Sequence, residues 1–180
     1  MHFLTDSRLP VLSTERLLLR PLEARDAPAI LALRSDERVN RYLDRPPMHE
    51  MEAAAAFITT INAGISRGDS AYWAVCLHEA PELAGTVCLW NFSADKKSVE
   101  LGYELRPAFQ GKGIMYEAVA IVIQFGFHTL DLQRITAVTH EQNEPSKRVL
   151  EKHGFLPYPS AERTEDGCLE YQLLRPQAIP

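Results

Sequence analysis

The chain has 180 residues, 46% of them apolar and 24% charged, which is enough to bury one core, so we expect a single domain over residues 1–180. The formal net charge of −5 excludes indiscriminate binding to nucleic acid, which needs a basic face, and it suits a cationic amine as a partner. The three cysteines, Cys76, Cys88 and Cys168, are widely spaced, so neither a disulfide framework nor a metal site is indicated.

The distribution of apolar residues also bears on location. The amino-terminal apolar run is too short for a signal peptide, and no run approaches the ~20 apolar residues of a membrane span. We therefore expect a cytoplasmic protein without a membrane partner. The sequence does not distinguish a monomer from a homodimer.

The first third of the chain predicts one strand and three helices. An apolar run over residues 16–22 predicts the strand. Asp26 is predicted to cap a helix that carries Pro28 in its first turn. A short helix is expected over residues 36–43, and apolar residues at helical spacing predict a longer one over 49–65.

The remaining elements are six strands and two helices. Two apolar-rich runs and one alternating segment predict a meander of three strands, and after a buried helix come another strand, a short helix and a closing hairpin around Asp166 and Gly167. The expected strands span residues 71–77, 83–92, 99–106, 133–139, 155–163 and 168–174, and the helices span 113–127 and 143–153.

The loop before the buried helix has the composition of an anion site. The first turn of a helix carries N–H groups without internal partners and the positive end of the helix dipole. Gly111 and Gly113 remove the β-carbons that would keep a pyrophosphate away, and Lys112 adds a cation. Ordinary loop chemistry is the alternative for such a turn. A P-loop is excluded because Lys112 is followed by glycine instead of Ser or Thr.

Three segments in chain order carry a family resemblance. Residues 110–115, Gln-Gly-Lys-Gly-Ile-Met, resemble the Gln/Arg-x-x-Gly-x-Gly/Ala signature with which the GNAT acetyltransferase superfamily holds the pyrophosphate of acetyl-CoA, although Met115 replaces Gly or Ala. Residues 13–22 are similar to the opening of the RimJ/RimL-type branch. Residues 143–155 resemble its Asn-x-x-Ser…Gly-Phe segment. The resemblance implies an α+β GNAT fold, with a mixed, mostly antiparallel central sheet of about seven strands flanked by helices.

The resemblance also implies acetyl-CoA as co-substrate, without a metal. The cofactor contacts it implies are Tyr103, Leu105, Gln110, Gly111, Lys112, Gly113, Ile114, Met115, Asn143 and Ser146. Ser146 is the candidate for contact with the leaving thiolate, near the positive end of a helix. Ordinary helix capping by Asn143 and Ser146 is the alternative. Some family members use a tyrosine seven residues after this Asn as acid, but Leu150 occupies that position here.

Glu100 is the candidate catalytic base. It precedes Gln110 by ten residues on a strand expected to be central, and hydrophobic walls should raise the pKa of its carboxyl. Alternatively, Glu100 lies on a solvated strand face with Glu104 or pairs with an arginine. Glu162 and Glu165 on the closing hairpin are second-choice bases, and water is a further alternative.

The implied function is transfer of an acetyl group to a primary amine by direct attack in a ternary complex. The RimJ/RimL resemblance implies a protein N-terminal α-amine, whereas other relatives of this branch act on small amines. A non-catalytic acyl-CoA-binding or regulatory module is the competing function. Acceptor specificity is expected in residues 26–68 and in the closing hairpin, where no motif identifies the amine.

Overall fold

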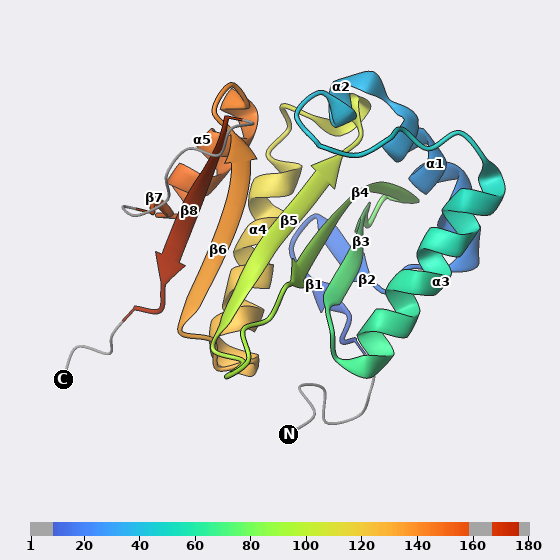
Figure 1. Ribbon diagram of the computed structural model, residues 1–180. Helices are drawn as coiled ribbons and strands as arrows, with labels where there is room; N and C mark the ends of the chain where they lie inside the picture. The colour runs from blue at the N-terminus through green and yellow to red at the C-terminus, as the bar shows by residue number, and fades with distance from the viewer. Residues whose placement is uncertain (1–8, 159–166, 177–180) are drawn as a thin grey trace.

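The computed structural model describes residues 9–158 and 167–176, which form one mixed sheet with helices on both faces (Figure 1). The eight strands in this part of the chain lie in the order β1-β2-β3-β4-β5-β6-β8-β7. They span Leu12–Ser13 (β1), Leu17–Arg20 (β2), Ala71–Leu77 (β3), Ala80–Trp90 (β4), Ser98–Leu105 (β5), Arg134–His140 (β6), Leu156–Pro157 (β7) and Cys168–Leu174 (β8). The helices are η1 (Ala24–Asp26), α1 (Ala27–Ser35), α2 (Glu37–Asn40), α3 (Met51–Arg67), η2 (Pro107–Phe109), α4 (Ile114–Gln124), the π-helical η3 (Phe125–Thr129) and α5 (Glu144–Lys152).

The predicted fold class is confirmed. All neighbouring strands are antiparallel except β5 and β6, which are parallel. The described chain has one strand more than the predicted seven. This extra strand is β1, a two-residue segment that pairs Leu12 with Leu19 of β2. No helix of the described chain combines the length and apolarity that a membrane crossing needs.

Several predicted boundaries were wrong. The strand predicted to begin at residue 83 begins at Ala80 as β4, because register shifts after Val75 and Cys76 let Leu77 pair with Ala80. The helix predicted over 113–127 ends as α4 at Gln124 and continues as π-helical η3. The helix predicted over 36–43 is limited to the four residues of α2. Of the closing hairpin, residues 159–166 lie outside the described residues.

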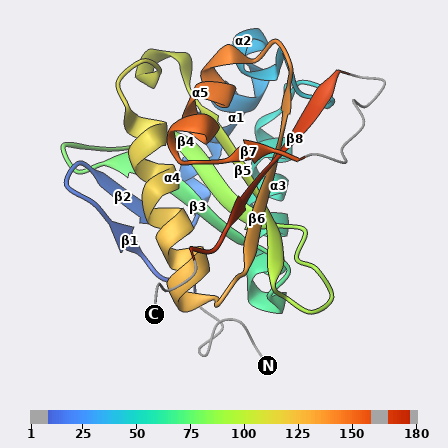
Figure 2. The ribbon, with the colours of Figure 1, turned by 90° about the vertical axis from the view of Figure 1, so that its left-hand side faces the viewer.

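The core occupies both faces of the sheet. Trp73 of β3 packs edge-on against Phe125 on the α4 face, whereas its neighbour Tyr72 packs edge-on against Phe57 of α3 on the other face. Successive strand residues point to opposite faces, so β3 is buried on both sides and is almost continuously apolar. Figure 2 shows α4 across one face of the sheet, with α3 behind the opposite face.

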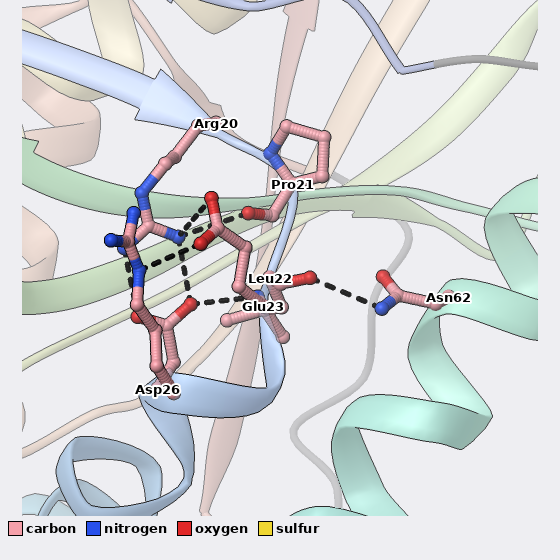
Figure 3. A network of polar contacts seen from close by, with 7 residues as sticks. Arg20, Pro21, Leu22, Glu23, Asp26 and Asn62 are labelled. Carbon is pink, nitrogen blue, oxygen red and sulfur yellow. Dashed lines mark hydrogen bonds and ion pairs between the residues drawn. The ribbon is translucent and has the colours of Figure 1, made fainter.

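A buried ion pair fixes the start of α1. Asp26 stands at the N-cap position, but its carboxylate does not cap α1 as predicted; it accepts from the Arg20 guanidinium at 2.7 and 2.8 Å and from the Glu23 N–H at 2.8 Å (Figure 3). The side chains of Arg20 and Asp26 are only 9% and 5% exposed. In the same region, Asn62 of α3 donates to the Leu22 carbonyl at 3.1 Å, so α1 and α3 are tied to one segment.

The parallel strands β5 and β6 separate along their length. They pair only from Ser98 with Arg134 to Glu100 with Thr136, and within the described residues the ladder between them ends there. The tip of β5, the start of α5 and the segment after α2 lie at the same end of the sheet (Figure 1). The opening between the two strands positions the candidate site.

Candidate active site

The loop between β5 and α4 presents unpaired backbone N–H groups. Gly111 and Gly113 both have φ of +73°, a left-handed conformation that glycine adopts without strain. Within residues 9–158 and 167–176, we find no protein acceptor in hydrogen-bonding geometry for the N–H groups of residues 111–115, and the N–H of Glu117 donates to the Gly113 carbonyl at 3.1 Å. Together with the dipole of α4, these donors suit an anion.

The loop borders a cleft of about 520 Å³, which we call the loop cleft. A β-carbon at Gly111 would meet nothing within 4 Å, so the glycine faces open space. The loop cleft is lined by the tip of β5, the loop, α4, α5 and the segment around α2. Every residue of the predicted cofactor set lines it except Lys112, namely Tyr103, Leu105, Gln110, Gly111, Gly113, Ile114, Met115, Asn143 and Ser146.

The polar side chains of the loop brace its backbone. Gln110 donates from its amide to the Leu105 carbonyl at 2.9 Å, and the Lys112 ammonium donates to the Ala108 carbonyl at 2.9 Å. Met115, which replaces the family's Gly or Ala, is only 6% exposed and packs into the hydrophobic core. Its bulk therefore leaves the N–H groups of the loop accessible.

A second brace comes from the amino-terminal motif. Thr14 donates to the Glu117 carboxylate at 2.5 Å, and Arg16 donates to the same carboxylate at 2.6 Å. Arg16 also donates to the Lys112 carbonyl at 3.0 Å. Arg16 lies in the amino-terminal motif, but the sequence predicted no role for it or for Glu117. Arg16 contacts a loop about a hundred residues away in the chain, and no local sequence pattern marks such a contact.

Tyr103 and Ser146 face each other where β5 and β6 have separated. The Tyr103 hydroxyl lies 2.9 Å from the Ser146 hydroxyl and donates to the Ser146 carbonyl at 3.1 Å. Burial raises the pKa of Tyr103 to about 12, so its phenol is protonated at neutral pH. The side-chain amide oxygen of Asn143 accepts from the Ser146 N–H at 3.3 Å, which is the capping contact weighed from the sequence.

A second cavity, of about 760 Å³, adjoins the loop cleft, and we call it the sheet cavity. Its walls come from α1, α3 and the strands β3 to β6. Six residues line both cavities and so stand at their junction, namely Tyr42, Leu43, Tyr103, Glu104, Asn143 and Ser146. The hydrogen-bonded pair of Tyr103 and Ser146 is part of that junction.

Glu100 lines the sheet cavity and is half-buried. Burial raises the pKa of its carboxyl, the hydrogen bond from Asn91 at 3.4 Å opposes this, and the charge of Glu170 adds to it. The arginine pairing weighed for Glu100 occurs instead at Glu104, which binds Arg45 at 2.5 and 2.7 Å. Glu162 and Glu165 lie outside the described residues.

Other residues that line the sheet cavity were not identified individually from the sequence. They include Arg34, Tyr42, Arg45, Phe57, Tyr72 and Trp90. They come from separate elements and share no motif or spacing. For Arg34, Tyr42, Arg45 and Phe57, the sequence predicted only the region, residues 26–68. In the described parts of the chain, no three His, Cys, Asp or Glu side chains are grouped to hold a metal ion.

Comparisons with known proteins agree with this geometry. Residues 16–156 match the family described as acetyltransferase (GNAT) domain. The chain is 35% identical over 146 residues to the uncharacterized N-acetyltransferase YoaA of Bacillus subtilis (strain 168), covering 81% of this chain and 82% of that protein. It is 25% identical over 144 residues to spermidine N(1)-acetyltransferase of Escherichia coli (strain K12), covering 79% and 74%.

The fold has solved counterparts as well. RimL, a ribosomal L7/L12 alpha-N-protein acetyltransferase in complex with coenzyme A, superposes with a TM-score of 0.80 at 20% identity, over 92% of this chain and 98% of that chain. At this identity the likeness shows the fold alone. The family match and the similarity to YoaA over most of both chains show more: this protein belongs to the GNAT family and is an acetyltransferase.

Proposed function

We propose that the protein moves an acetyl group from acetyl-CoA to a primary amine by direct attack in a ternary complex. The observation that carries this proposal is the meeting of two cavities at Tyr103 and Ser146, one rich in unpaired N–H groups and one containing a half-buried carboxylate. Two substrates held in adjoining cavities are positioned against each other, which favours direct attack of the amine on the thioester.

The loop cleft would hold the donor. The N–H groups of residues 111–115 are suited to its diphosphate, and the space in front of Gly111 leaves room for it. When bound, acetyl-CoA supplies the activated thioester. The protonated Tyr103 phenol, the Ser146 hydroxyl and the positive end of α5 lie where a departing thiolate needs stabilisation.

The sheet cavity would hold the amine. An amine is nucleophilic only without its extra proton, so a base must accept that proton. Glu100 is the proposed acceptor, directly or through water, because its raised pKa lies closer to neutrality than that of an exposed carboxyl. The relatives offer two kinds of amine, a protein N-terminus as for RimL and a polyamine as for the spermidine enzyme.

The test combines binding with turnover. Calorimetric titration should show saturable binding of acetyl-CoA, and mass spectrometry of a panel of primary amines and N-terminal peptides should show acetylated products with equimolar release of thiol. Binding without acetylation of any amine would instead favour an acyl-CoA-binding module. Absence of acetyl-CoA binding would contradict the whole proposal.

A further inference from the structure

Arg34 of α1 is a largely buried cation with little hydrogen bonding. Its side chain is 19% exposed and lines the sheet cavity, with the guanidinium carbon 4.3 Å above the centre of the Phe57 ring. Its one ion pair in the described chain is with Glu104, at 3.5 Å, and no hydrogen bond from its guanidinium to a protein acceptor is present among those residues. An arginine has five N–H donors, so most of those of Arg34 are available to a ligand.

The partner of Arg34 is already neutralised by another residue. Glu104 receives two hydrogen bonds from the Arg45 guanidinium, at 2.5 and 2.7 Å. Two guanidinium groups share one carboxylate, so the cluster of Arg34, Arg45 and Glu104 carries one excess positive charge. Because all three side chains are mostly buried, that charge is weakly screened by solvent.

The excess charge stands at a defined distance from the proposed base. Glu100 and Glu104 are four residues apart on β5 and point to the same face, which places them roughly 13 Å apart along the strand. Both line the sheet cavity. The cavity is also lined by Asp44 and by Asp69, which pairs with Arg67. The Glu100 carboxylate and the free donors of Arg34 together are complementary to a molecule that has an amine and an anionic group.

We propose that the acceptor is a primary amine that also carries a carboxylate, and that Arg34 binds this carboxylate. The planar guanidinium matches a carboxylate with two parallel hydrogen bonds, and the contact of its central carbon with the Phe57 ring restricts where the guanidinium lies. Arg34 is thus a specificity residue for the acceptor. The inference depends on the proposed acetyl transfer for its biological meaning, but carboxylate binding is testable without turnover.

The experiment uses matched ligand pairs. Amino acids, from α-amino acids to longer ω-amino acids and dipeptides, are each compared with the carboxamide that lacks the negative charge. Their affinities are measured by calorimetry on protein saturated with CoA, so no acetyl group is transferred. The wild type should bind the carboxylate member of at least one pair about tenfold to hundredfold more tightly than its amide.

Two variants separate the role of Arg34 from general damage. Arg34→Gln should remove the preference and leave affinity for the amide unchanged. Arg25→Gln, at an arginine 68% exposed and ion-paired with Glu23, should keep the wild-type preference. Equal loss for both members of a pair in Arg34→Gln would indicate a purely structural role and overturn the inference.

The wild-type comparison alone can also overturn it, whether or not a variant folds. Equal affinity for acid and amide in every pair, or no binding of any carboxylate-bearing amine, contradicts the inference. Thiol release from acetyl-CoA, measured separately with uncharged amines and amides, reports on the transferase itself. If acetyl groups are transferred but acids bind no better than amides, the proposed function stands and the inference about Arg34 fails. If acids bind better but no acetyl group is transferred, the inference stands and the proposed function fails.

Discussion

The loop cleft and the sheet cavity adjoin each other but are built from different groups. The loop cleft offers backbone N–H groups on a loop that two braces hold, one from Gln110 and Lys112 and the other from Arg16. The sheet cavity offers side chains from at least six elements. In the proposed reaction, backbone donors would recognise the diphosphate of the cofactor, and the side chains of the sheet cavity could change without disturbing the loop. The proposal therefore allows one donor site to be combined with different acceptor sites.

The largest expected effect lies in the sheet cavity, at Glu100. Replacing a general base reduces catalysis typically by about 10²–10⁴-fold, so Glu100→Gln should lower kcat by that order while the affinity for acetyl-CoA stays unchanged. Steady-state kinetics and calorimetry on the same preparation measure both. Unchanged kcat at neutral pH would transfer the role to water or to Glu162 or Glu165.

The pH dependence of the wild type tests the same assignment. Only the deprotonated carboxylate accepts a proton, and burial raises the pKa of Glu100 above its ordinary value of 4.5. Turnover should therefore rise with pH through an apparent pKa higher than 4.5 and then level off. Glu100→Gln should lack this acidic limb, which would remain if another group were the base.

The next effect concerns the buried ion pair at the start of α1, a helix that lines the sheet cavity. Asp26→Asn removes the buried partner of the Arg20 charge, which keeps only its longer pair with the partly exposed Glu23 at 3.8 Å, so the free energy of unfolding at neutral pH should fall by about 3–5 kcal/mol. Asp69→Asn, which breaks the exposed pair with Arg67, should change it by about 1 kcal/mol or less. Urea unfolding measures both, and equal losses would contradict the distinction between buried and exposed pairs.

This contribution has a defined pH window. Burial by itself raises the pKa of Asp26, but hydrogen bonds from Arg20 and the Glu23 N–H lower it below the ordinary value of 3.8. The ion pair therefore contributes its full stability above that value and loses it as the pH falls through the lowered native pKa. The difference between wild type and Asp26→Asn should shrink at acidic pH.

A smaller effect is expected at the loop cleft. Gly113→Ala and Gly154→Ala both place a β-carbon at positive φ where there is room, so each should cost about 1–2 kcal/mol of stability. Only Gly113→Ala should weaken CoA binding, by about tenfold, because the N–H groups that follow would be reoriented. Equal CoA affinities for the two variants by calorimetry would argue against the loop as the anion site.

The smallest effect is expected from the second brace. Glu117→Gln removes the charge that holds Arg16 but keeps a hydrogen-bonding side chain, so the KM for acetyl-CoA should rise a few-fold with kcat unchanged, consistent with a loss of about 1 kcal/mol. Glu52→Gln on the exposed face of α3 is the matched control. A fall in kcat alone would place Glu117 in the chemistry instead.

The lining of the loop cleft was largely predictable from the sequence because it is local. Residues 110–115 form one contiguous motif, and nine of the ten predicted contact residues line a single cleft. The alternation in β5 and the apolar run of α4 likewise predicted these two elements, whereas the fold class followed from the resemblance to the GNAT family. The boundaries that were wrong, such as β4 beginning at Ala80, depend on register shifts between strands that pattern alone does not encode.

The residues of the sheet cavity and its supporting contacts were not predictable in the same way. Arg34 and Phe57 stack across two helices, and Glu104 turned out to be the arginine partner that had been weighed for Glu100. Asp26 was assigned to a cap because its position fits one, yet a buried Arg20 six residues earlier captures the carboxylate. These outcomes depend on tertiary contacts that have no sequence spacing of their own.

The central claim is that the free N–H groups of residues 111–115 hold the diphosphate of CoA. The most direct measurement is an NMR titration of ¹⁵N-labelled protein with CoA, following each backbone amide. We expect the amides of residues 111–115 to show the largest saturable shifts, with weaker changes around Ser146. Saturable binding that leaves those amides unshifted would contradict it.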